Sequence, residues 1–462
     1  MGTLLVKNAD VVITMDDRRR QIHGGGIFVR DNVIEHIGPT DDLPGEADEV
    51  IEAKGMAILP GLVNTHHHFF QSLFRAVPGA QNHGLFDWLV RLFPIYGELT
   101  DEAVYISSLT AMAEMILSGC TTSSDHLYLY PNNATLDAQI RAVREIGLRF
   151  HATRGALSLG RSQGGLTPDS LVETDEAILN DCQRVIETYH DPDPFSMLRV
   201  GLAPATPFTV TKDLMRETAK LARSYKNVRL HTHVAETKDE EVYCLREFNQ
   251  RPVDYMVEQG WVGPDVWWAH TIVVNSDEIK LLAETGTGVA HCPSSNMRLG
   301  SGICPVRDML DAGVKVGIGV DGSASNDCGH VMNEARMALL LQRVNGGPGM
   351  FTVEEGLELA TRGGAAVLGR TDIGSLAVGQ AADFIGINLN TLSLAGGAVH
   401  DPLAALLLCR VDRVDLSVIN GQAIVRYGEL LTVDLDKLIT RHNEIAAELV
   451  SRHPEAEQFK LV

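Results

Sequence analysis

The chain has 462 residues and a formal net charge of −21, from 39 basic and 60 acidic side chains. Apolar residues make up 45% of it and charged residues 21%, which is typical of a globular protein and excludes a disordered or collagen-like chain. The surplus of acid argues against binding to nucleic acid, which requires clustered Lys and Arg, and the length indicates about three domains or one large barrel with an appendage.

Seven cysteines are scattered along the chain without a Cys-x-x-Cys pair, which is typical of reduced thiols rather than of a disulfide framework. Residues 1–17 contain no basic segment followed by a long apolar stretch, so we expect no signal peptide. No window approaches the roughly 18 uninterrupted apolar residues of a membrane span. We therefore expect a cytoplasmic protein with no membrane partner.

Both ends of the chain are rich in short β-branched runs separated by Asn, Asp and Gly. These runs are residues 4–6, 11–13 and 27–29 near the start, and 384–387, 416–419 and 423–425 near the end. Asn420-Gly421 predicts a tight hairpin turn between the last two runs. We expect residues 1–57 and 371–430 to form one small β-sandwich. The final segment, 431–462, is expected to form a helix over 434–451 on the outside of the molecule.

The central residues, 58–370, alternate between strand-like and helix-like segments. The strand-like runs are 58–64, 121–125, 149–153, 198–203, 228–233, 266–270, 288–292 and 315–321. Helices are expected after Thr100, which can cap a helix that begins with Asp101 and Glu102, and over 212–224. Eight such strands predict an α/β fold of the TIM type, a (β/α)₈ barrel. A doubly wound sheet is the structural alternative.

Polar side chains follow the first barrel strand. Side chains alternate along a strand, so His66 and His68 share one face and His67 points away. Two imidazoles at this spacing can bind one metal ion, although a His triplet can also be a polar strand end. Taken alone, the triplet leaves both interpretations open.

Later strands end in the same kind of residue. The fifth run ends at His233 and is followed by Glu236, the sixth ends at His270, and the eighth ends at Asp321. An acid at the end of an apolar strand is costly unless it is paired or lies near a metal. Active-site residues of such barrels lie at the carboxyl ends of strands, so we expect these side chains to meet. Each of them alone could be structural.

Three imidazoles and one carboxylate suit a borderline-soft divalent ion with water in an open position. Zn²⁺ is the expected ion, one per subunit, and Fe²⁺ stays open as an alternative. Such an ion lowers the pKa of its water from about 16 toward about 7. A carboxylate three residues beyond a ligand, as Glu236 is, is well placed to move protons.

Four motifs resemble the amidohydrolase superfamily, and the similarity covers nearly the whole chain. They are Pro60-Gly-Leu-Val-Asn-Thr-His-His-His68, His231-Thr-His-Val-Ala-Glu-Thr237, His291-Cys-Pro-Ser-Ser-Asn296 and Gly319-Val-Asp-Gly-Ser-Ala-Ser-Asn326. The branch is the mononuclear one that holds guanine deaminase, cytosine deaminase, adenosylhomocysteine deaminase and the s-triazine hydrolases. The resemblance implies that His66, His68, His233 and Asp321 hold the metal. It also implies that Glu236 and His270 assist catalysis, and Asp321 is expected to accept the proton of the water.

Only a few residues indicate which substrate within this branch the chain acts on. Gln71 and Trp88 match positions that bind the base in guanine deaminase, and the stretches 71–78 and 154–158 look most like members that deaminate 8-oxoguanine and isocytosine. Residues 203–208 lack the Arg that guanine deaminase carries in the corresponding segment. The resemblance therefore implies hydrolytic deamination of a 2-amino-4-oxopyrimidine or 2-amino-6-oxopurine base, with release of ammonia.

Several of these residues have a plainer interpretation. Trp88 lies in an apolar run and could simply pack in the core, and Gln71 could cap the following helix. Asn296 and Arg298 could line the site or stabilise their loop. Cys292 is expected to pack rather than to act as a nucleophile, because no partner arrangement is evident.

Alternative functions stay open at this stage. The chain could hydrolyse an s-triazine or act on an adenosylhomocysteine-type substrate, or it could be a non-catalytic scaffold that kept the fold. A scaffold has no reason to keep the complete set of ligands and proton carriers. The expected partners are a small nucleobase and water, and the resemblance implies a homo-oligomer.

Overall fold

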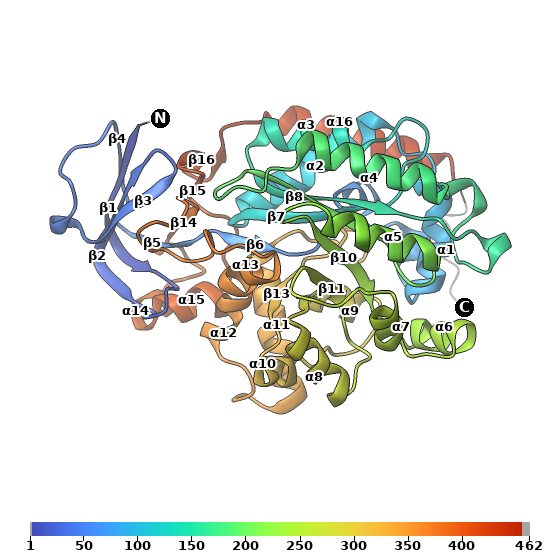
Figure 1. Cartoon of the computed structure of the whole chain (residues 1–462). Coiled ribbons are helices and arrows are strands. Elements are labelled where there is room, and N and C mark those ends of the chain that lie inside the picture. The colour runs from blue at the N-terminus through green and yellow to red at the C-terminus, as the bar shows by residue number, and fades with distance from the viewer. Residues whose placement is uncertain (1, 455–462) are drawn as a thin grey trace.

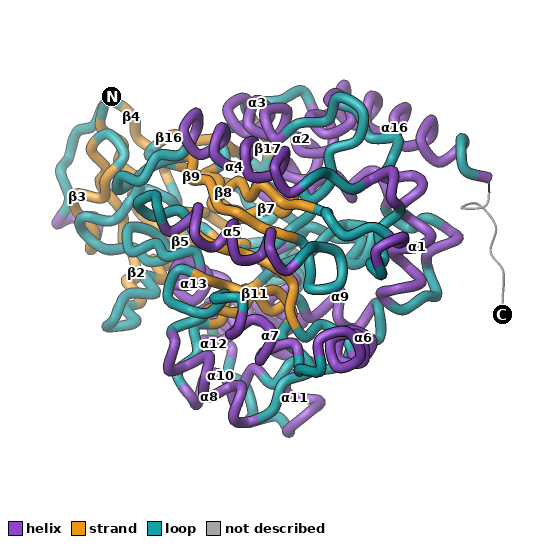
Figure 2. Tube along the Cα trace, turned by 45° about the vertical axis from the view of Figure 1, so that its right-hand side comes forward, coloured by secondary structure: helices purple, strands orange, loops and turns teal. Residues whose placement is uncertain are grey.

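The computed structural model describes residues 2–454, and Figure 1 shows a small β-domain beside a larger α/β body. Residues 455–462, the end of the expected C-terminal segment, lie outside the described residues. Figure 2 shows the strands of the larger body at its centre, with helices and loops around them. The predicted (β/α)₈ barrel is confirmed, and the small β-sandwich expected from both chain ends is found as a sheet domain built from both ends.

Within residues 2–454, eight parallel strands form the barrel sheet in sequence order. They are β6 (Leu62–Asn64), β7 (Cys120–Leu127), β8 (Arg149–Ala156), β9 (Leu198–Pro204), β10 (Arg229–Val234), β11 (Val266–His270), β12 (Gly288–His291) and β13 (Val316–Ile318). The first and last strands meet just beyond β6, where the Thr65 amide donates to the Ile318 carbonyl at 2.8 Å. The sheet therefore closes on itself at the end where the polar residues follow the strands.

The strands of the smaller domain form one sheet of nine within the described residues. They are β1 (Thr3–Ile13), β2 (Gln21–Arg30), β3 (Val33–Pro39), β4 (Glu49–Glu52), β5 (Met56–Pro60), β14 (Phe384–Asn388), β15 (Leu416–Ile419), β16 (Gln422–Arg426) and β17 (Glu429–Leu430). Strand β5 joins the two halves because it pairs with β1 on one side and β14 on the other. The hairpin of β15 and β16 turns at Asn420 and Gly421, whose φ angles of 52° and 79° suit the predicted turn.

The strand expected over 58–64 is two strands in two different sheets. Strand β5 ends at Pro60 in the smaller sheet, and β6 begins at Leu62 in the barrel. Between them, a Cβ at Gly61 would overlap the Thr121 side chain on β7. The absence of a side chain at Gly61 lets the chain pass closely from one sheet to the other.

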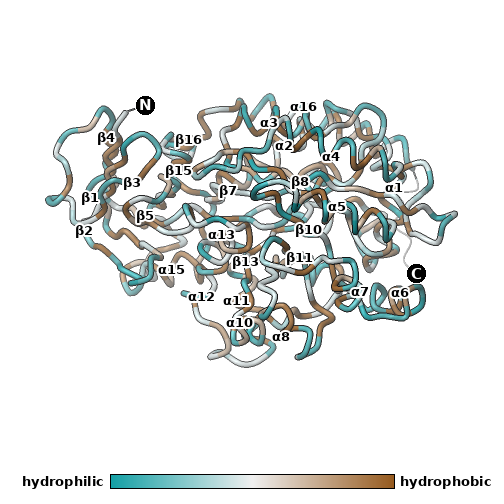
Figure 3. Tube along the Cα trace, viewed as in Figure 1, coloured by the Kyte–Doolittle hydropathy of each residue, from teal (hydrophilic) through white to brown (hydrophobic). Residues whose placement is uncertain are grey.

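Helices surround the barrel, and Figure 3 shows hydrophobic and hydrophilic residues alternating along many of them. They are α1 (Leu85–Tyr96), α2 (Asp101–Leu117), α3 (Leu136–Ile146), α4 (Asp175–Tyr189), α5 (Lys212–Arg223), α6 (Lys238–Phe248), α7 (Pro252–Glu258), α8 (Ser276–Thr285), α9 (Pro293–Arg298), α10 (Val306–Ala312), α11 (Val331–Gly346), α12 (Val353–Glu358), α13 (Gly364–Val367), α14 (Gly397–His400), α15 (Pro402–Leu408) and α16 (Leu435–Ser451). Among the residues described, no helix combines the length and apolar character needed to cross a bilayer.

The helices predicted from their ends are found where expected. The Thr100 hydroxyl accepts from the amide of Ala103 and caps α2, with Asp101 and Glu102 in the first turn. Helix α5 begins and ends within one residue of the predicted range. Helix α16 lies on the outside against α2, where Arg441 pairs with Glu102 at 2.8 Å.

Candidate active site

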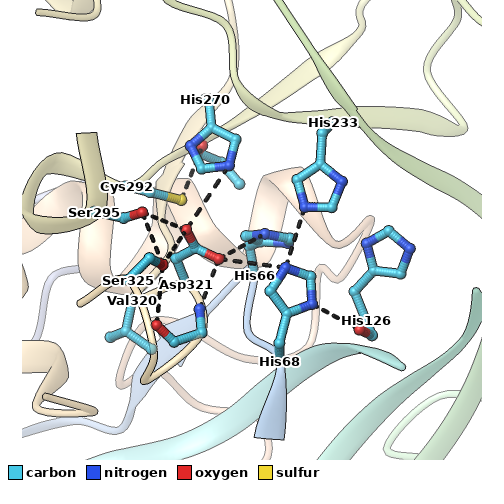
Figure 4. Close-up of polar contacts among 12 residues, drawn as sticks. His66, His68, His126, His233, His270, Cys292, Ser295, Val320, Asp321 and Ser325 are labelled. Atoms are coloured by element: carbon cyan, nitrogen blue, oxygen red, sulfur yellow. Dashed lines mark hydrogen bonds and ion pairs between the residues drawn. The ribbon is translucent and has the colours of Figure 1, made fainter. Parts of the chain in front are cut away.

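The candidate residues converge at the carboxyl end of the barrel. His66 and His68 follow β6, His233 lies in β10, His270 ends β11 and Asp321 follows β13. All five side chains are buried. Figure 4 shows the imidazoles of His66, His68 and His233 turned toward the Asp321 carboxylate. Parallel strands bring their carboxyl ends to one edge, which is why residues so far apart in sequence meet here.

Four of these side chains bring one nitrogen or oxygen atom each into a small volume. Asp321 Oδ1 lies 3.3 Å from the Nε2 atoms of both His66 and His68. His68 Nε2 in turn lies 3.1 Å from His233 Nε2. His67, the middle member of the triplet, is buried outside this cluster and packs against the Phe69 ring.

Hydrogen bonds fix which ring nitrogen of His68 and His233 faces the cluster. His68 Nδ1 lies 2.7 Å from the His126 carbonyl, and His233 Nδ1 lies 2.7 Å from the Ala205 carbonyl. A carbonyl oxygen only accepts, so both Nδ1 atoms carry the hydrogen. The Nε2 lone pairs are therefore left to face the centre, as metal binding requires.

A second histidine, His231, holds His66 in the same tautomer, with the hydrogen on Nδ1. His231 Nδ1 donates to the Trp267 carbonyl at 3.0 Å, which leaves His231 Nε2 as an acceptor 2.7 Å from His66 Nδ1. His66 Nε2 therefore carries a lone pair, and it has no hydrogen-bond partner among the described residues. A buried polar atom without a partner is costly, and a divalent cation would satisfy it. A donor set of three neutral imidazoles and one carboxylate suits a divalent metal. The ligand atoms of His66, His68 and His233 lie within 4.8 Å of one another, as do those of His66 and Asp321.

Burial keeps the imidazoles neutral and neighbouring groups keep Asp321 ionised. Burial lowers the pKa of His233 to about 3 and that of His66 well below 6.5. Burial alone would raise the pKa of Asp321, but the close approach of His66 and the nearby His270 hold it well below its usual value. The Asp321 carboxylate also accepts hydrogen bonds from Ser325 Oγ at 3.1 Å and from the Gly322 amide at 2.6 Å.

Glu236 and His270 lie side by side next to the cluster. His270 Nε2 is 3.6 Å from Glu236 Oε2 and 3.9 Å from Asp321 Oδ2. Burial raises the pKa of Glu236 to about 7, against the attraction of His270. Burial would lower the pKa of His270, but Glu236 and Asp321 together raise it above 6.5. Such a pair can hold and transfer a proton near neutral pH.

A pocket opens from the cluster. Its polar lining, apart from the cluster and Glu236, includes Gln71, Tyr128, Thr206 and Thr209, and its apolar wall includes Trp88. Apolar walls with a few polar groups are typical of pockets for small ring compounds.

Gln71 and Trp88 both line the pocket. Gln71 lies inside the 3-10 helix η2 (Phe69–Phe74) rather than at its end, and its Nε2 lies 3.4 Å from the Tyr128 hydroxyl. Trp88 is only 3% exposed and packs in the core, yet its ring also lines the pocket. Its Nε1 donates to the Ala324 carbonyl at 3.3 Å. Core packing and a place in the pocket wall are therefore compatible for Trp88.

Asn296 contacts a residue of the site, whereas Arg298 contacts neighbouring loops. Asn296 Oδ1 accepts from His270 Nδ1 at 3.0 Å, so Asn296 touches the site. Arg298 pairs with Asp327 at 3.1 Å and donates to the Gln81 carbonyl, which ties loops together outside the pocket. Burial raises the pKa of the Cys292 thiol well above 9, which suits a packing residue rather than a nucleophile.

His126 lies beside the cluster, with a ring nitrogen within 4.8 Å of those of His66, His68 and His233, and it was not predicted from the sequence. Its ring stacks on His233 with centroids 4.9 Å apart, and its backbone carbonyl orients His68. Its Nε2 lies 2.7 Å from the Ala203 carbonyl. The signal was the polar end of β7, which runs to Leu127, two residues beyond the expected strand.

Three buried carboxylates behind the site were also missed. Asp125 accepts from the Phe69 amide at 2.5 Å, Glu334 from the Ser294 amide at 2.8 Å, and Glu240 from the Glu236 amide at 2.8 Å. Each therefore holds the backbone of a segment that follows a barrel strand. Two of the three lie on helices, where a sequence pattern does not distinguish them from surface acids.

Known proteins resemble this chain over nearly its whole length. A profile of the amidohydrolase family matches residues 57–424. An 8-oxoguanine deaminase from Pseudomonas aeruginosa is 46% identical over 92% of this chain and 95% of its own length. A hydroxydechloroatrazine ethylaminohydrolase from Pseudomonas sp. strain ADP is 38% identical over 94% and 93%. The crystal structure of atrazine chlorohydrolase TrzN from Arthrobacter aurescens TC1 complexed with zinc has a TM-score of 0.91 and 32% identity, over 96% of this chain and all of that one.

Proposed function

The chain belongs to the amidohydrolase family and is a metal-dependent aminohydrolase, and we propose that it deaminates a 2-amino-4-oxopyrimidine ring, either as free isocytosine or within 8-oxoguanine. The observation that carries this proposal is the position of Glu236. Its carboxyl group, with a pKa near 7, faces both the four-residue cluster and the pocket. The similarity to an 8-oxoguanine deaminase supports the choice of base.

We propose that His66, His68, His233 and Asp321 hold one Zn²⁺. Their lone pairs face one another without protons on the inner ring nitrogens, and zinc-bound relatives of the same fold support this ion over Fe²⁺. A metal bound here would act as a Lewis acid and lower the pKa of a coordinated water toward about 7. The remaining steps depend on side chains of this chain.

Glu236 is the proposed proton donor to the substrate. Because its pKa is near 7, a large share of Glu236 is protonated at neutral pH and can donate to the ring nitrogen beside carbon 2. That protonation makes carbon 2 more electrophilic. The ionised Asp321 accepts one proton from the attacking water, while His270 orients the water between the two carboxylates.

The protons then balance in the second half of the reaction. The water oxygen is now a hydroxyl group on carbon 2, and the amino group takes the proton from Asp321. The bond between carbon 2 and nitrogen breaks, ammonia leaves, and the hydroxyl proton returns to Glu236. Carbon 2 becomes a carbonyl, and both carboxyl groups regain their starting states.

Recognition of the base is assigned to Gln71 and Trp88. The Gln71 amide lies at the pocket wall, where it can bond the carbonyl of the ring, and the Trp88 indole offers an apolar surface for the flat ring. Thr206, in the segment 203–208 that lacks an Arg, and the neighbouring Thr209 also line the pocket. These uncharged side chains suit contact with an uncharged base.

One assay tests the proposal. Ammonia release is measured with isocytosine, 8-oxoguanine, guanine, cytosine and hydroxylated aminotriazines, and metal content is measured on the same sample. We expect release from isocytosine or 8-oxoguanine with about one zinc per chain. Turnover confined to the triazines would favour the chemistry named for the 38% identical relative instead. A metal-free, inactive protein would favour a scaffold.

The remaining assignments are also proposals. We propose that residues 58–370 form the catalytic unit, flanked by a sheet domain of residues 1–57 and 371–430 and a C-terminal segment of residues 431–462. Free thiols at all seven cysteines support a cytoplasmic location. A homo-oligomer is proposed from the family resemblance, and light scattering on the purified protein would test it.

A further inference from the structure

Glu240 forms hydrogen bonds with the backbone on both sides of the Cα atom of Ala235, in the active-site loop. Its Oε1 accepts from the Ala235 amide at 2.9 Å, and its Oε2 accepts from the Glu236 amide at 2.8 Å. These two N–H groups flank the Cα atom of Ala235, so a single carboxylate fixes the backbone there. The Glu240 side chain is fully buried.

The Thr-x-x-Glu pattern of residues 237–240 also occurs at residues 352–355, where the Glu side chain makes a different contact. In helix α12, Thr352 and Glu355 form a capping box, in which the Glu side chain bonds the amide of the capping residue itself. Helix α6 begins with the equivalent pair, and Thr237 accepts from the Glu240 amide at 3.3 Å. The Glu240 carboxylate, however, reaches past Thr237 to the two preceding amides. Its contacts therefore serve the loop before the helix.

The backbone that Glu240 holds is one that residues other than glycine rarely adopt. Ala235 has a φ of 54°, in the left-handed region, where the chain turns sharply away from β10. Two successive N–H groups in such a turn form a concave site for oxygen acceptors, and both oxygens of the Glu240 carboxyl group occupy it. Because this turn directly precedes Glu236, it determines where the Glu236 side chain begins.

The burial of Glu240 also requires an explanation. None of the described Lys or Arg side chains forms an ion pair with it, so the two amides are its main compensation. Burial raises the pKa of Glu240 to about 8, and the two amide hydrogen bonds oppose that rise. A residue needed only to cap a helix could remain exposed, as Glu355 partly does on α12.

We propose that Glu240 is a positioning residue for catalysis: by holding the amides on both sides of Ala235, it sets the Glu236 carboxyl group against His270 and the substrate ring. The inference rests on the proposed role of Glu236 as proton donor. Misplacing a reacting group by about 1 Å can cost about 100-fold in rate. The effect of Glu240 should therefore appear in kcat rather than in substrate affinity or metal binding.

The test compares Glu240→Gln with Glu355→Gln. The side-chain amide introduced by Glu240→Gln can accept from only one of the two N–H groups and turns its own NH₂ toward the other. We expect kcat to fall about 10- to 100-fold with KM within about threefold and metal content unchanged. Glu355→Gln makes the same chemical change in a capping box outside the active site, keeps an oxygen that can accept from the Thr352 amide, and should keep full kcat. Equal kcat losses in both variants, or none in Glu240→Gln, would overturn the inference.

A double-mutant cycle separates positioning from general loosening. In a Glu236→Gln background the proton donor is gone, so Glu240→Gln should lower the residual rate less than about threefold. A merely structural role would lower both backgrounds equally. If Glu240→Gln fails to fold, Glu240→Asp replaces it, because the shorter carboxylate can reach one amide and should give an intermediate kcat. Absence of ammonia release from the unmodified protein would instead contradict the proposed function itself.

Discussion

Asn296 Oδ1 lies 3.0 Å from Nδ1 of His270. An amide oxygen only accepts, so His270 Nδ1 carries a hydrogen and its Nε2 is the atom that faces Glu236 and Asp321. The contact fixes the ring in one orientation. It gives Asn296 a place beside the reacting groups, whereas Arg298, two residues later, binds a neighbouring loop.

Replacement of Asn296 should therefore impair catalysis without removing the metal. In Asn296→Leu the acceptor is lost at similar volume, and His270 is free to rotate. We expect kcat to fall about 10- to 100-fold with metal content unchanged. Asn296→Asp is the matched control, because it still accepts from Nδ1, and it should retain more activity than the Leu variant. An Asn296→Leu enzyme with normal kcat would mean that the ring is held by other contacts.

Glu236→Gln removes the proposed proton donor and little else. The side chain keeps its size, and its main-chain bond to Glu240 is unaffected. General acid–base catalysis is typically worth about 100- to 10,000-fold, and we expect a loss of kcat within that range. Metal analysis of the same sample should give unchanged content. Near-normal turnover would exclude Glu236 from proton transfer.

The pH dependence of activity should reflect the raised pKa of Glu236. Burial moves this pKa from 4.5 to about 7, so the carboxyl group stays protonated up to about neutral pH. Because the protonated form is the donor, titration of Glu236 should leave kcat/KM constant below pH 7. Well above pH 7, kcat/KM should fall about tenfold per pH unit. Profiles measured with two substrates of different ring pKa provide the control. A limb that moves with the substrate would belong to the base rather than to Glu236.

His231 should control metal affinity through His66. Its Nε2 accepts from His66 Nδ1, which keeps the opposite nitrogen of His66 free of a proton. In His231→Phe the stacking on Trp267 can persist, but the acceptor is lost. We expect metal affinity, measured by competition with a chelator, to fall about 10- to 100-fold. His151→Phe, which replaces a buried histidine on β8, should leave affinity unchanged, and a loss in both variants would indicate nonspecific loosening of the barrel.

The part of the site that a sequence can predict is the part that follows strand ends. His66, His233 and Asp321 could be placed together because parallel strands of a barrel present their carboxyl ends at one rim. Asn420-Gly421 could be assigned to a turn because few residues accept its backbone angles. In these cases the physical rule acts over a few neighbouring residues or over a regular repeat.

The supporting contacts could not be predicted in the same way. Glu240 begins a helix with a normal capping pattern, and only the fold shows that its carboxylate turns back to the loop. His231 is the first member of a His-x-His pair, but its hydrogen bond to His66 joins residues 165 positions apart. Likewise, the break at Gly61 becomes apparent only when Thr121 is seen beside it. Such contacts depend on how distant segments pack.

The glycine that follows Asp321 provides a test of substrate recognition by Gln71. A Cβ at Gly322 would overlap Gln71 Oε1, and no left-handed backbone forbids alanine there. Gly322→Ala should therefore push the Gln71 side-chain amide out of its place in the pocket. The hydrogen bond from the backbone N–H of residue 322 to the Asp321 carboxylate should persist. Loss of one hydrogen bond to the carbonyl of the base predicts a fall in kcat/KM of about 3- to 10-fold, with metal content unchanged. Gln71→Leu should give a similar fall, and the double variant should add little to either.

Gly38→Ala, where a Cβ meets nothing within 4 Å, is the control and should behave as the unmodified protein does. If the Gly322 and Gln71 effects multiplied instead, Gly322 would act by another route, and if neither variant changed kcat/KM, the base would be recognised elsewhere in the pocket.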